Sequence, residues 1–342
     1  MKPWNRLLAY LVSTQGILSA CFPVVAQTPE HAPQIGLLSW QPCDLPSYLK
    51  GRGGAFGEFI NGLIDLGYKP GETVKIACRS ADYHYDRLAS ATEELLRLPV
   101  DVIVSASQPA GMSAHKVTTT VPVVTVISGN PVGAGLARSL GNPGMNVTGV
   151  TYYATELTAK RLELLKQMLP KLNTVGVLTN PDFTITNPDF VPLPFEDDTR
   201  KAAQTLGIKL SIQSAREPTD IEAAVARMKA DGAQAMFVLP DLMFGSQALR
   251  IAELALAAKL PTMGWGDWFT KAGCLMSYSA DYDRMTRRLA FYVDRILKGA
   301  GPGDLPIEQP IQFRLSINMK TAKSLGLDPP LTLLTMADIV IE

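Results

Sequence analysis

The sequence predicts an α/β fold of two similar lobes, each built on a parallel sheet with helices on both faces. Short apolar, β-branched runs alternate with helical patterns along the chain, which is typical of α/β proteins. Several of these runs are apolar at nearly every position, as expected for parallel strands that are covered on both faces. The order of elements then repeats in the second half of the chain, which predicts two lobes in tandem.

Strands are expected where β-branched and apolar residues lie between turn-forming residues. These segments are 34–39, 74–77, 102–106, 123–127, 175–179, 209–213, 235–239, 262–265 and 274–278. A further strand, "NVTGVTYY" at 146–153, is expected to carry the chain from the first lobe to the second. Helices are expected where apolar residues recur at spacings of three and four. These segments are 54–66, 87–98, 156–169, 197–206, 221–230 and 247–258.

The repeat is visible as pairs of similar segments at an offset of about 140 residues. "IGLLSW" from Ile35 resembles "VGVLTN" from Val175, and "DLGYK" resembles "TLGIK" at the end of a helix in each half. "VDVIVSAS" pairs with "AQAMFVLPD", and "TVPVVTV" pairs with "KLPTMGW". The similarity predicts two doubly wound lobes that face each other.

Composition and charge exclude some classes of partner. The 342 residues are enough for two domains. Since 32 basic residues balance 32 acidic ones, the chain lacks the basic excess of nucleic-acid-binding proteins, and we expect no nucleic-acid partner.

The N-terminus has the pattern of a secretory signal peptide. Lys2 and Arg6 precede an apolar stretch at 7–18, and small residues follow it. Two cleavage sites remain open: after Ala26, which gives a signal peptide of residues 1–26, or before Cys21, which would then be the lipidated first residue of a lipoprotein. In both cases the protein is expected in the periplasm or on the extracytoplasmic face of the membrane, which it would touch only through the lipid anchor.

Three cysteines remain beyond this segment, in a compartment that permits disulfides. Cys43 follows the first expected strand and Cys78 ends the second, so a bridge between them and two separate buried thiols are both open. The third is Cys274. The three histidines are scattered and no C-x-x-C spacing occurs, so we expect no metal site.

The glycine-rich stretch at 126–150 does not have the pattern of a nucleotide-binding loop. Three residues after Gly133-Ala134-Gly135 stands Arg138 instead of glycine, and the stretch follows the fourth strand of its lobe instead of the first. No G-x-S-x-G sequence occurs either: Gly111-Met112-Ser113-Ala114-His115 lacks the second glycine. We therefore expect no cofactor and no enzyme activity.

From residue 33 on, the chain carries stretches typical of one family. They are "LGYKPGETVKI", "ATEELLRLPVDVIVSAS", "SGNPVGAGLARSLGNPGMNVTGVT", "ELTAKRLELLKQMLP", "LPTMGWGDWFTKAGCLMSYSADYDRMTRRLAFYVDRILKGAGPGDLPIEQP" and "FRLSINMKTAKSLGL". In these the chain resembles the substrate-binding proteins of bacterial ABC transporters with the type 1 periplasmic-binding-protein fold, and among them the tryptophan- and tyrosine-type binders. One segment, 181–198, looks longer than in that family.

The resemblance implies a chain that crosses between the lobes three times. The helix at 283–297 would return to the first lobe, and the segment 312–327 to the second. The lobes would then comprise 33–149 plus 279–308, and 150–278 plus 309–342. They would close on a ligand by a hinge motion.

Ligands of open α/β sheets bind beyond the carboxyl ends of the strands. The candidate ligand-binding residues at these ends are Ser39, Trp40, Gln41, Ser107, Gln108, Ser128, Asn130, Asn180, Asp241, Trp265, Asp267 and Tyr278. Ser107 and Ser128 could hold a carboxylate, Asp241 or Asp267 an ammonium group, and Trp40 and Trp265 an apolar side chain. Each Ser, Asn or Asp could instead only cap a helix or shape a turn.

Together these features predict the extracytoplasmic solute-binding protein of an ABC importer, a monomer that delivers a small molecule to a permease in the inner membrane. The ligand is expected to be an amino acid or related carboxylate, and the tryptophans favour an aromatic one. A periplasmic sensor subunit for a signalling receptor is the alternative, and an α/β enzyme is a weaker one.

Overall fold

The computed structural model describes residues 32–152, 157–181 and 195–342. The expected signal peptide with Cys21, and most of the long segment 181–198, lie outside these residues. In the described ranges, no helix is long and apolar enough to cross a membrane.

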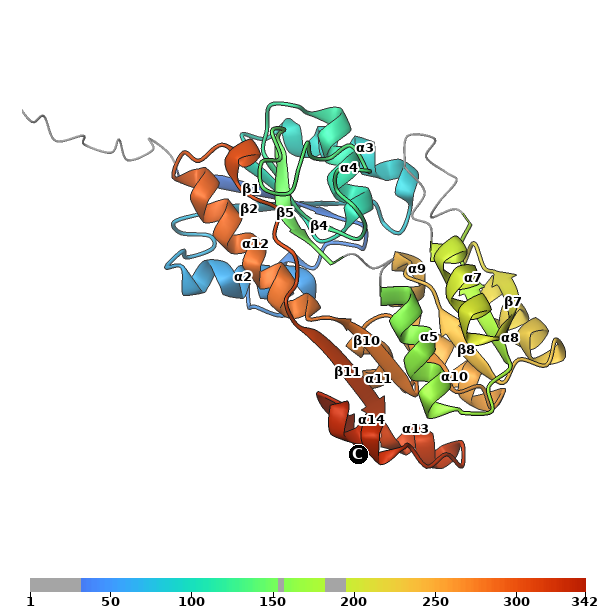
Figure 1. Ribbon diagram of the computed structural model, residues 1–342. Helices are drawn as coiled ribbons and strands as arrows, with labels where there is room; N and C mark the ends of the chain where they lie inside the picture. Colours follow the sequence, from blue (N-terminus) through green and yellow to red (C-terminus); the bar gives the residue numbers. More distant parts are fainter. Residues whose placement is uncertain (1–31, 153–156, 182–194) are drawn as a thin grey trace, which may run out of the picture. The chain divides into compact units, whose positions relative to one another are not determined.

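The first lobe is built on a five-stranded parallel sheet in the order β2-β1-β3-β4-β5. Its strands are β1 (Gln34–Ser39), β2 (Lys75–Ser80), β3 (Val102–Ser105), β4 (Val123–Ile127) and β5 (Val147–Thr151). Side chains on alternate faces pack against different helices: one face contacts α2 (Ala55–Asp65) and α12 (Tyr282–Leu297), the other α3 (Leu88–Leu96) and α4 (Gln108–Val117). Figure 1 shows α2 and α12 side by side.

The second lobe is built on a seven-stranded sheet in the order β12-β11-β10-β9-β8-β6-β7. Its strands are β6 (Thr174–Thr179), β7 (Lys209–Ser214), β8 (Ala235–Val238), β9 (Thr262–Gly264), β10 (Met276–Ala280), β11 (Phe313–Asn318) and β12 (Ile339–Ile341). All pairs are parallel except β10 with β11. One face packs against α5 (Leu157–Met168) and α7 (Phe195–Leu206), and the other against α8 (Asp220–Ala230), α10 (Ala248–Ala257) and α11 (Asp267–Lys271).

The internal repeat is a repeat of topology. The order β2-β1-β3-β4-β5 of the first sheet matches β7-β6-β8-β9-β10 of the second. Gly36 and Gly176 occupy equivalent places in β1 and β6, and each lies under a helix side chain. A Cβ atom would lie 3.3 Å from Leu95 at Gly36 and 2.7 Å from Met228 at Gly176. The two glycines therefore let the covering helices approach the central strands closely.

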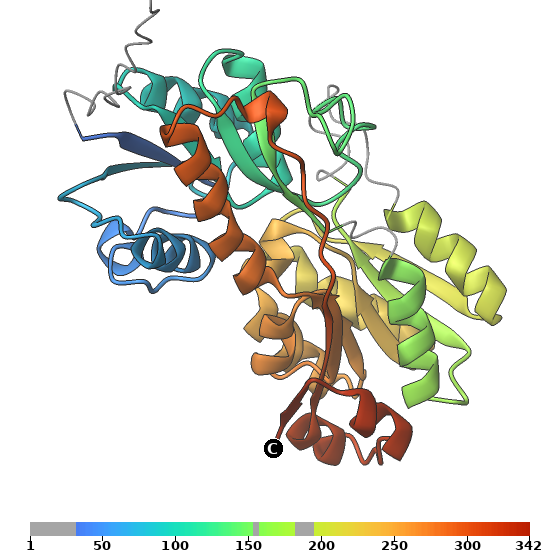
Figure 2. The ribbon, with the colours of Figure 1, turned by 60° about the vertical axis from the view of Figure 1, so that its left-hand side comes forward.

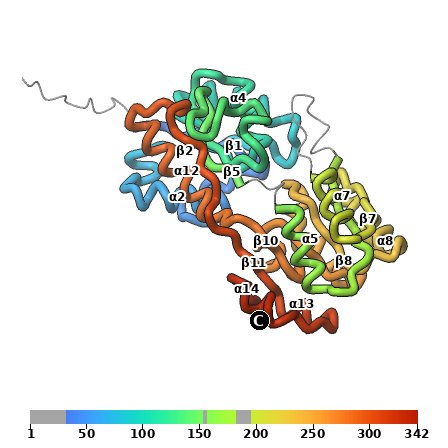
Figure 3. Tube along the Cα trace, in the orientation of Figure 1, coloured from blue at the N-terminus to red at the C-terminus, as the bar shows by residue number. Residues whose placement is uncertain are grey.

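The chain passes between the two sheets three times, which Figure 3 follows along the tube. It leaves β5 for α5, returns from β10 into α12, and leaves again after Glu308 for β11. The parallel bridge between Val150 and Glu308 pairs the first of these segments with the third. In Figure 2 the last segment continues into the C-terminal helices α13 (Met319–Ser324) and α14 (Leu331–Met336).

Several elements differ from the sequence-based expectation. The strand expected as a crossing, β5, hydrogen-bonds to β4 and forms the edge of the first sheet. β2 extends to Ser80, so Cys78 lies inside the strand, and β10 runs from Met276 to Ala280. The short helices α1 (Leu45–Tyr48), α9 (Leu242–Ser246) and α11, and the longer α4, were not expected, because they are too short or too evenly buried to show an apolar stripe.

Cys43 and Cys78 form a disulfide, with their Cα atoms 6.2 Å apart. It joins the loop after β1 to the neighbouring strand β2. Cys274 is a buried free thiol. Of the two possibilities left open by the sequence, the structure contains the bridge.

Candidate functional site

Each sheet reverses its direction of strand addition next to its first strand, between β1 and β3 in one lobe and between β6 and β8 in the other. Loops diverge at such a point and leave a crevice at the carboxyl ends of the strands. Trp40 and Ser107 follow β1 and β3, whereas Asn180 and Asp241 follow β6 and β8. The fold therefore brings polar and aromatic residues of both lobes to its two crevices.

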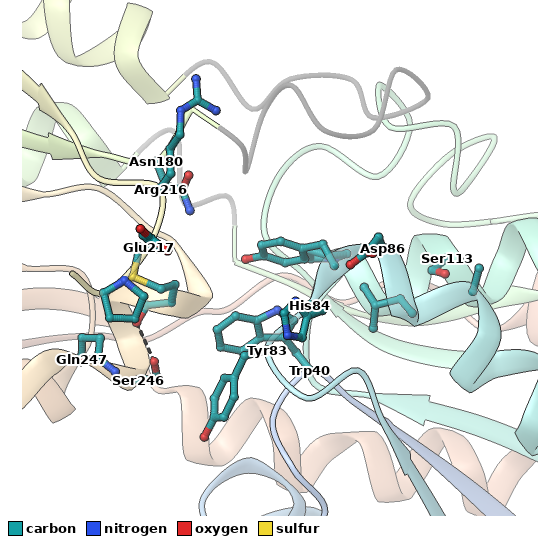
Figure 4. Close-up of a pocket in the computed structure, with 16 residues that line it drawn as sticks. Trp40, Tyr83, His84, Asp86, Ser113, Asn180, Arg216, Glu217, Ser246 and Gln247 are labelled. Atoms are coloured by element: carbon teal, nitrogen blue, oxygen red, sulfur yellow. Dashed lines mark hydrogen bonds between the residues drawn. The ribbon is translucent and has the colours of Figure 1, made fainter. Parts of the chain in front are cut away.

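Two hollows and one small space lie among these loops. The first hollow, of about 660 Å³, is lined by Trp40, Tyr83 and Tyr85 of the first lobe and by Asn180, Arg216 and Gln247 of the second, among others. Figure 4 shows the residues that line this hollow, which come from both lobes. The second hollow, of about 580 Å³, is lined by Trp40, Ser107, Trp265, Trp268 and Lys271, among others. The small space lies against Ser107, Ser128, Asp241 and Trp265.

An aromatic wall of the first lobe borders both hollows, since Trp40 and Tyr83 line each of them. The Trp40 ring contacts Tyr83 edge to face at 5.0 Å between centroids and Tyr85 at 5.5 Å. Asp82 and Tyr83 have φ angles of 48° and 69°, a conformation that non-glycine residues rarely adopt and that clusters at functional sites. The Tyr83 amide donates to the Trp40 carbonyl at 2.8 Å, which fixes this loop against the end of β1.

A second aromatic cluster combines Trp265 of the loop after β9 with Trp268 of α11 and Tyr282 of α12. Trp265 contacts Trp268 edge to face at 4.6 Å, and Trp268 reaches Tyr282 at 5.6 Å. Trp265 is 6% exposed and lines both the second hollow and the small space. These rings offer flat apolar surfaces to a planar ligand.

Asp241 is the buried acid of the site, with 3% of its surface exposed. One carboxylate oxygen accepts from the Phe244 amide at 3.0 Å and caps α9. The other accepts from Asn180 Nδ2 at 3.2 Å and from the Tyr85 hydroxyl at 3.5 Å. Burial raises the pKa of Asp241 to about 6, although these hydrogen bonds act in the opposite direction. A cation beside it would stabilise the ionised form.

Ser107 and Ser128 lie on the first-lobe side of the small space. Ser107 occupies the N-cap position of α4, but its hydroxyl makes no capping hydrogen bond and is available to a ligand. Burial raises the pKa of Tyr152, and the neighbouring Ser128 hydroxyl acts in the opposite direction. The hydroxyl of Tyr282 donates to the Ala106 carbonyl and fixes the loop between β3 and α4.

Arg161 hydrogen-bonds backbone carbonyls in β10 and in the loop after β9. It is fully buried in α5, and its guanidinium donates to the carbonyls of Tyr278 at 2.8 Å and Trp265 at 3.5 Å. Burial lowers its pKa to about 10. By binding these carbonyls, Arg161 sets the position of the Trp265 loop.

The remaining candidates divide into two groups. Ser39, Gln41 and Asp267 line the second hollow, where Asp267 pairs with Lys271 at 2.7 Å. Gln108, Asn130 and Tyr278 line none of the three spaces described above.

Each of these three side chains has another role. The Gln108 side chain is fully buried, and its oxygen accepts from the amides of Ser128 and Gly129 at 2.9 Å each. Asn130 accepts from the amides of Val132 and Gly133 in a turn. The Tyr278 ring stacks on Phe313.

Sequence reasoning missed Tyr83, Tyr85, Arg161 and Tyr282. The two loop tyrosines lie in "SADYHYD", directly after the true end of β2 at Ser80. Extending the expected strand by three residues would have placed them among the strand-end candidates. Arg161 and Tyr282 lie in helices, where the strand-end rule does not apply.

The described residues contain no group of three or more His, Cys, Asp or Glu side chains that could hold a metal ion. The lining of the three spaces includes the buried carboxylate of Asp241, hydroxyl donors, aromatic faces and the charged side chains of Arg216 and Lys271. Such a set can bind a small zwitterion with an apolar side chain.

Comparison with known proteins identifies a matching family and a similar protein of known ligand. Residues 41–341 match the family described as "ABC transporter substrate binding protein". A "Tyrosine-binding protein" of Clostridioides difficile (strain R20291) is 26% identical over 270 residues, which are 79% of this chain and 75% of that protein.

Solved structures share the fold. A conserved domain protein from Vibrio cholerae superposes with a TM-score of 0.79 at 24% identity, over 91% of this chain and 100% of that one. An ABC domain in complex with L-Trp from "Streptococcus pneumonia" superposes with a TM-score of 0.78, also at 24% identity and with the same coverage.

Proposed function

Because the chain belongs to the ABC transporter substrate binding protein family, we propose that it captures an amino acid with an aromatic side chain between its lobes. Members of this family bind solutes outside the cytoplasm for a membrane permease and are not enzymes. The observation that carries the ligand assignment is the buried carboxylate of Asp241 beside walls of tryptophan and tyrosine.

In this proposal Asp241 binds the ammonium group of the ligand. The carboxylate is more than nine-tenths buried, and its burial raises its pKa to about 6. An ammonium group would replace the long contact from the Tyr85 hydroxyl, at 3.5 Å, with a charge-assisted hydrogen bond.

Ser107 and Ser128 supply hydroxyl donors for the ligand carboxylate on the opposite side of the small space. The hydroxyl of Ser107 is free of a capping bond at the start of α4, where backbone N–H groups also favour an anion. The ligand's two charged ends would then contact different lobes, so binding would favour their closure.

The side chain of the ligand would lie against Trp40 and Trp265 in the second hollow. Burying an aromatic ring between such faces contributes apolar area and ring stacking. The names of two similar proteins support this class of ligand: one is a tyrosine-binding protein, and another was solved with L-Trp.

A thermal-shift panel tests the proposal. A ligand at a hundredfold excess over its Kd stabilises the folded protein by about 2.7 kcal/mol, which raises Tm by a few degrees. We expect shifts with L-tyrosine or L-tryptophan and none with their N-acetyl derivatives, which lack the ammonium group. Shifts with sugars or purines alone would contradict the proposed ligand class.

We further propose that the chain begins with a signal peptide, which comprises residues 1–26, or residues 1–20 if cleavage occurs before Cys21 and that cysteine is lipidated. The intact mass of the protein purified from its native envelope distinguishes a chain that begins at Gln27 from one that begins at a lipidated Cys21. A mass that retains residues 1–20 would contradict both.

A further inference from the structure

Two buried indole N–H groups have no hydrogen-bond acceptor among the described residues: those of Trp40 and Trp265. The two side chains are only 5% and 6% exposed. Buried donors in native proteins nearly always have a partner, because an unpaired one loses its bonds to water without compensation. Both N–H groups therefore need an acceptor that the described chain does not provide.

The two indoles belong to the same cleft but to different lobes. Trp40 follows β1 and Trp265 follows β9, and both line the second hollow. Trp265 also lines the small space beside Ser107 and Asp241. The rings of both indoles line this hollow, but their nitrogen atoms are enclosed, so a bound molecule would reach the N–H groups only as the lobes close on it.

A neighbouring tryptophan provides a contrast. Trp268 lines the same hollow and contacts Trp265 at 4.6 Å between ring centroids. Its N–H group is not among the buried unpaired ones. Trp268 is therefore a matched control for the loss of an indole from this wall.

The edge-to-face contacts of Trp40 with Tyr83 and of Trp265 with Trp268 offer ring faces to these N–H groups. An N–H group that points at a ring makes a weaker bond than one to an oxygen atom. An oxygen acceptor on a ligand would therefore still be favoured.

We infer that the N–H groups of Trp40 and Trp265 are specificity determinants that donate hydrogen bonds to oxygen acceptors of the bound molecule. The acceptor is an oxygen on the aromatic ring or an oxygen of the carboxylate. This inference rests on the proposed function, since it places an amino acid against both indoles. A site built to pair with an oxygen rejects an analogue that lacks it, because the site's own polar groups are then left unpaired.

The test measures the affinities of L-tyrosine, L-phenylalanine and phenethylamine for the purified protein and for three variants, Trp40→Phe, Trp265→Phe and Trp268→Phe. Phenylalanine lacks the ring oxygen of tyrosine, and phenethylamine also lacks the carboxylate. Each substitution keeps an aromatic ring and removes the N–H group. Melting temperatures show whether each variant is folded.

We expect Trp40→Phe and Trp265→Phe to lose about tenfold in affinity for a ligand that carries the acceptor and about twofold or less for one that lacks it. A loss confined to tyrosine assigns the acceptor to the ring, and a loss shared by tyrosine and phenylalanine assigns it to the carboxylate. Trp268→Phe should change all three affinities equally. Equal losses for all three ligands in Trp40→Phe and Trp265→Phe would overturn the inference but leave the proposed function intact. Failure of the unaltered protein to bind any of the three would overturn the inference, and failure to bind L-tryptophan as well would overturn the proposed function.

A second readout needs no substitution in the measured protein. The chain has four tryptophans, so few indole ¹H–¹⁵N resonances need assignment. Addition of saturating L-tyrosine should move the proton resonances of Trp40 and Trp265 downfield and leave that of Trp268 nearly unmoved. Unmoved resonances at Trp40 and Trp265, with binding shown by other signals, would overturn the inference.

Discussion

At the scale of single residues, Asp241 is the group on which ammonium recognition depends. Asp241→Asn keeps the shape of the side chain and its ability to cap α9 but removes the charge. Loss of a buried charge-assisted hydrogen bond should weaken binding of L-tyrosine by about 1.5–3 kcal/mol, measured by titration calorimetry. Asp267→Asn is the matched control, because that acid already pairs with Lys271. If Asp267→Asn weakened binding and Asp241→Asn did not, the two roles would be reversed.

The raised pKa of Asp241 predicts a pH dependence of binding. An ammonium ligand prefers the ionised carboxylate, so below the pKa of about 6 the affinity should fall by up to about tenfold per pH unit. Above pH 7 it should be constant until the ligand's own amine titrates. Asp241→Asn should show no such fall between pH 7 and 5. An unaltered protein whose affinity is constant from pH 7 to 5 would contradict the assignment.

The same pKa shift makes the ligand-free protein less stable as the pH rises, whereas it makes ligand binding stronger. The folded state holds the Asp241 proton more tightly than the unfolded state, whose ordinary pKa is 3.8. The free energy of unfolding therefore decreases as the pH rises from about 4 to about 6. Ligand binding at pH 7 offsets this unfavourable burial of charge.

A substitution at Gly149 in β5 tests how closely β5 approaches β4 near the first crossing between the lobes. Its φ is +139°, and a Cβ atom would lie 2.1 Å from the Thr125 carbonyl oxygen. Backbone atoms cannot move aside cheaply, so Gly149→Ala should lower the free energy of unfolding by about 2–4 kcal/mol in urea denaturation. Gly141→Ala, where nothing lies within 4 Å of the added Cβ, should change it little. Equal effects at both positions would contradict the described geometry of β5.

At the scale of elements, the disulfide anchors the loop that carries Trp40 and Gln41 to β2. The bridge spans 35 positions, so its removal in Cys43→Ser/Cys78→Ser should cost about 3–4 kcal/mol of stability. A reductant should lower the Tm of the unaltered protein and of Cys274→Ala, which keeps the bridge. It should leave the Tm of the double variant unchanged. Reductant-insensitive melting of the unaltered protein would show that the bridge is absent.

Strands and helices with a clear apolar run or apolar stripe could be predicted from the sequence. Elements without such a pattern could not. β1 and β4 have the expected bounds because their apolar, β-branched runs are flanked by turn residues. α4 could not be recognised, because Gln108-Pro109-Ala110-Gly111 lacks an apolar stripe and the helix is buried on nearly all sides. β2 was placed too short, because its half-buried end, Cys78-Arg79-Ser80, has no apolar run.

At the scale of the whole molecule, the repeat was the most informative feature of the sequence. Two sheets of equal strand order place their crevices at the ends of β1, β3, β6 and β8, which is why Trp40, Ser107, Asn180 and Asp241 could be nominated. Residues whose contacts join distant elements could not be nominated from the sequence. The contact of Tyr85 with Asp241 joins positions 156 apart, and Arg161 reaches carbonyls more than 100 positions away. Such contacts depend on tertiary packing that no local pattern encodes.

The most direct measurement is a calorimetric titration of the purified protein with L-tyrosine and L-tryptophan at pH 7.5. The proposed cleft predicts saturable binding of at least one of them with one ligand per chain, and no heat from the matching N-acetyl amino acid. Saturable binding of a sugar or a purine, with no heat from any amino acid, would contradict the proposed ligand class.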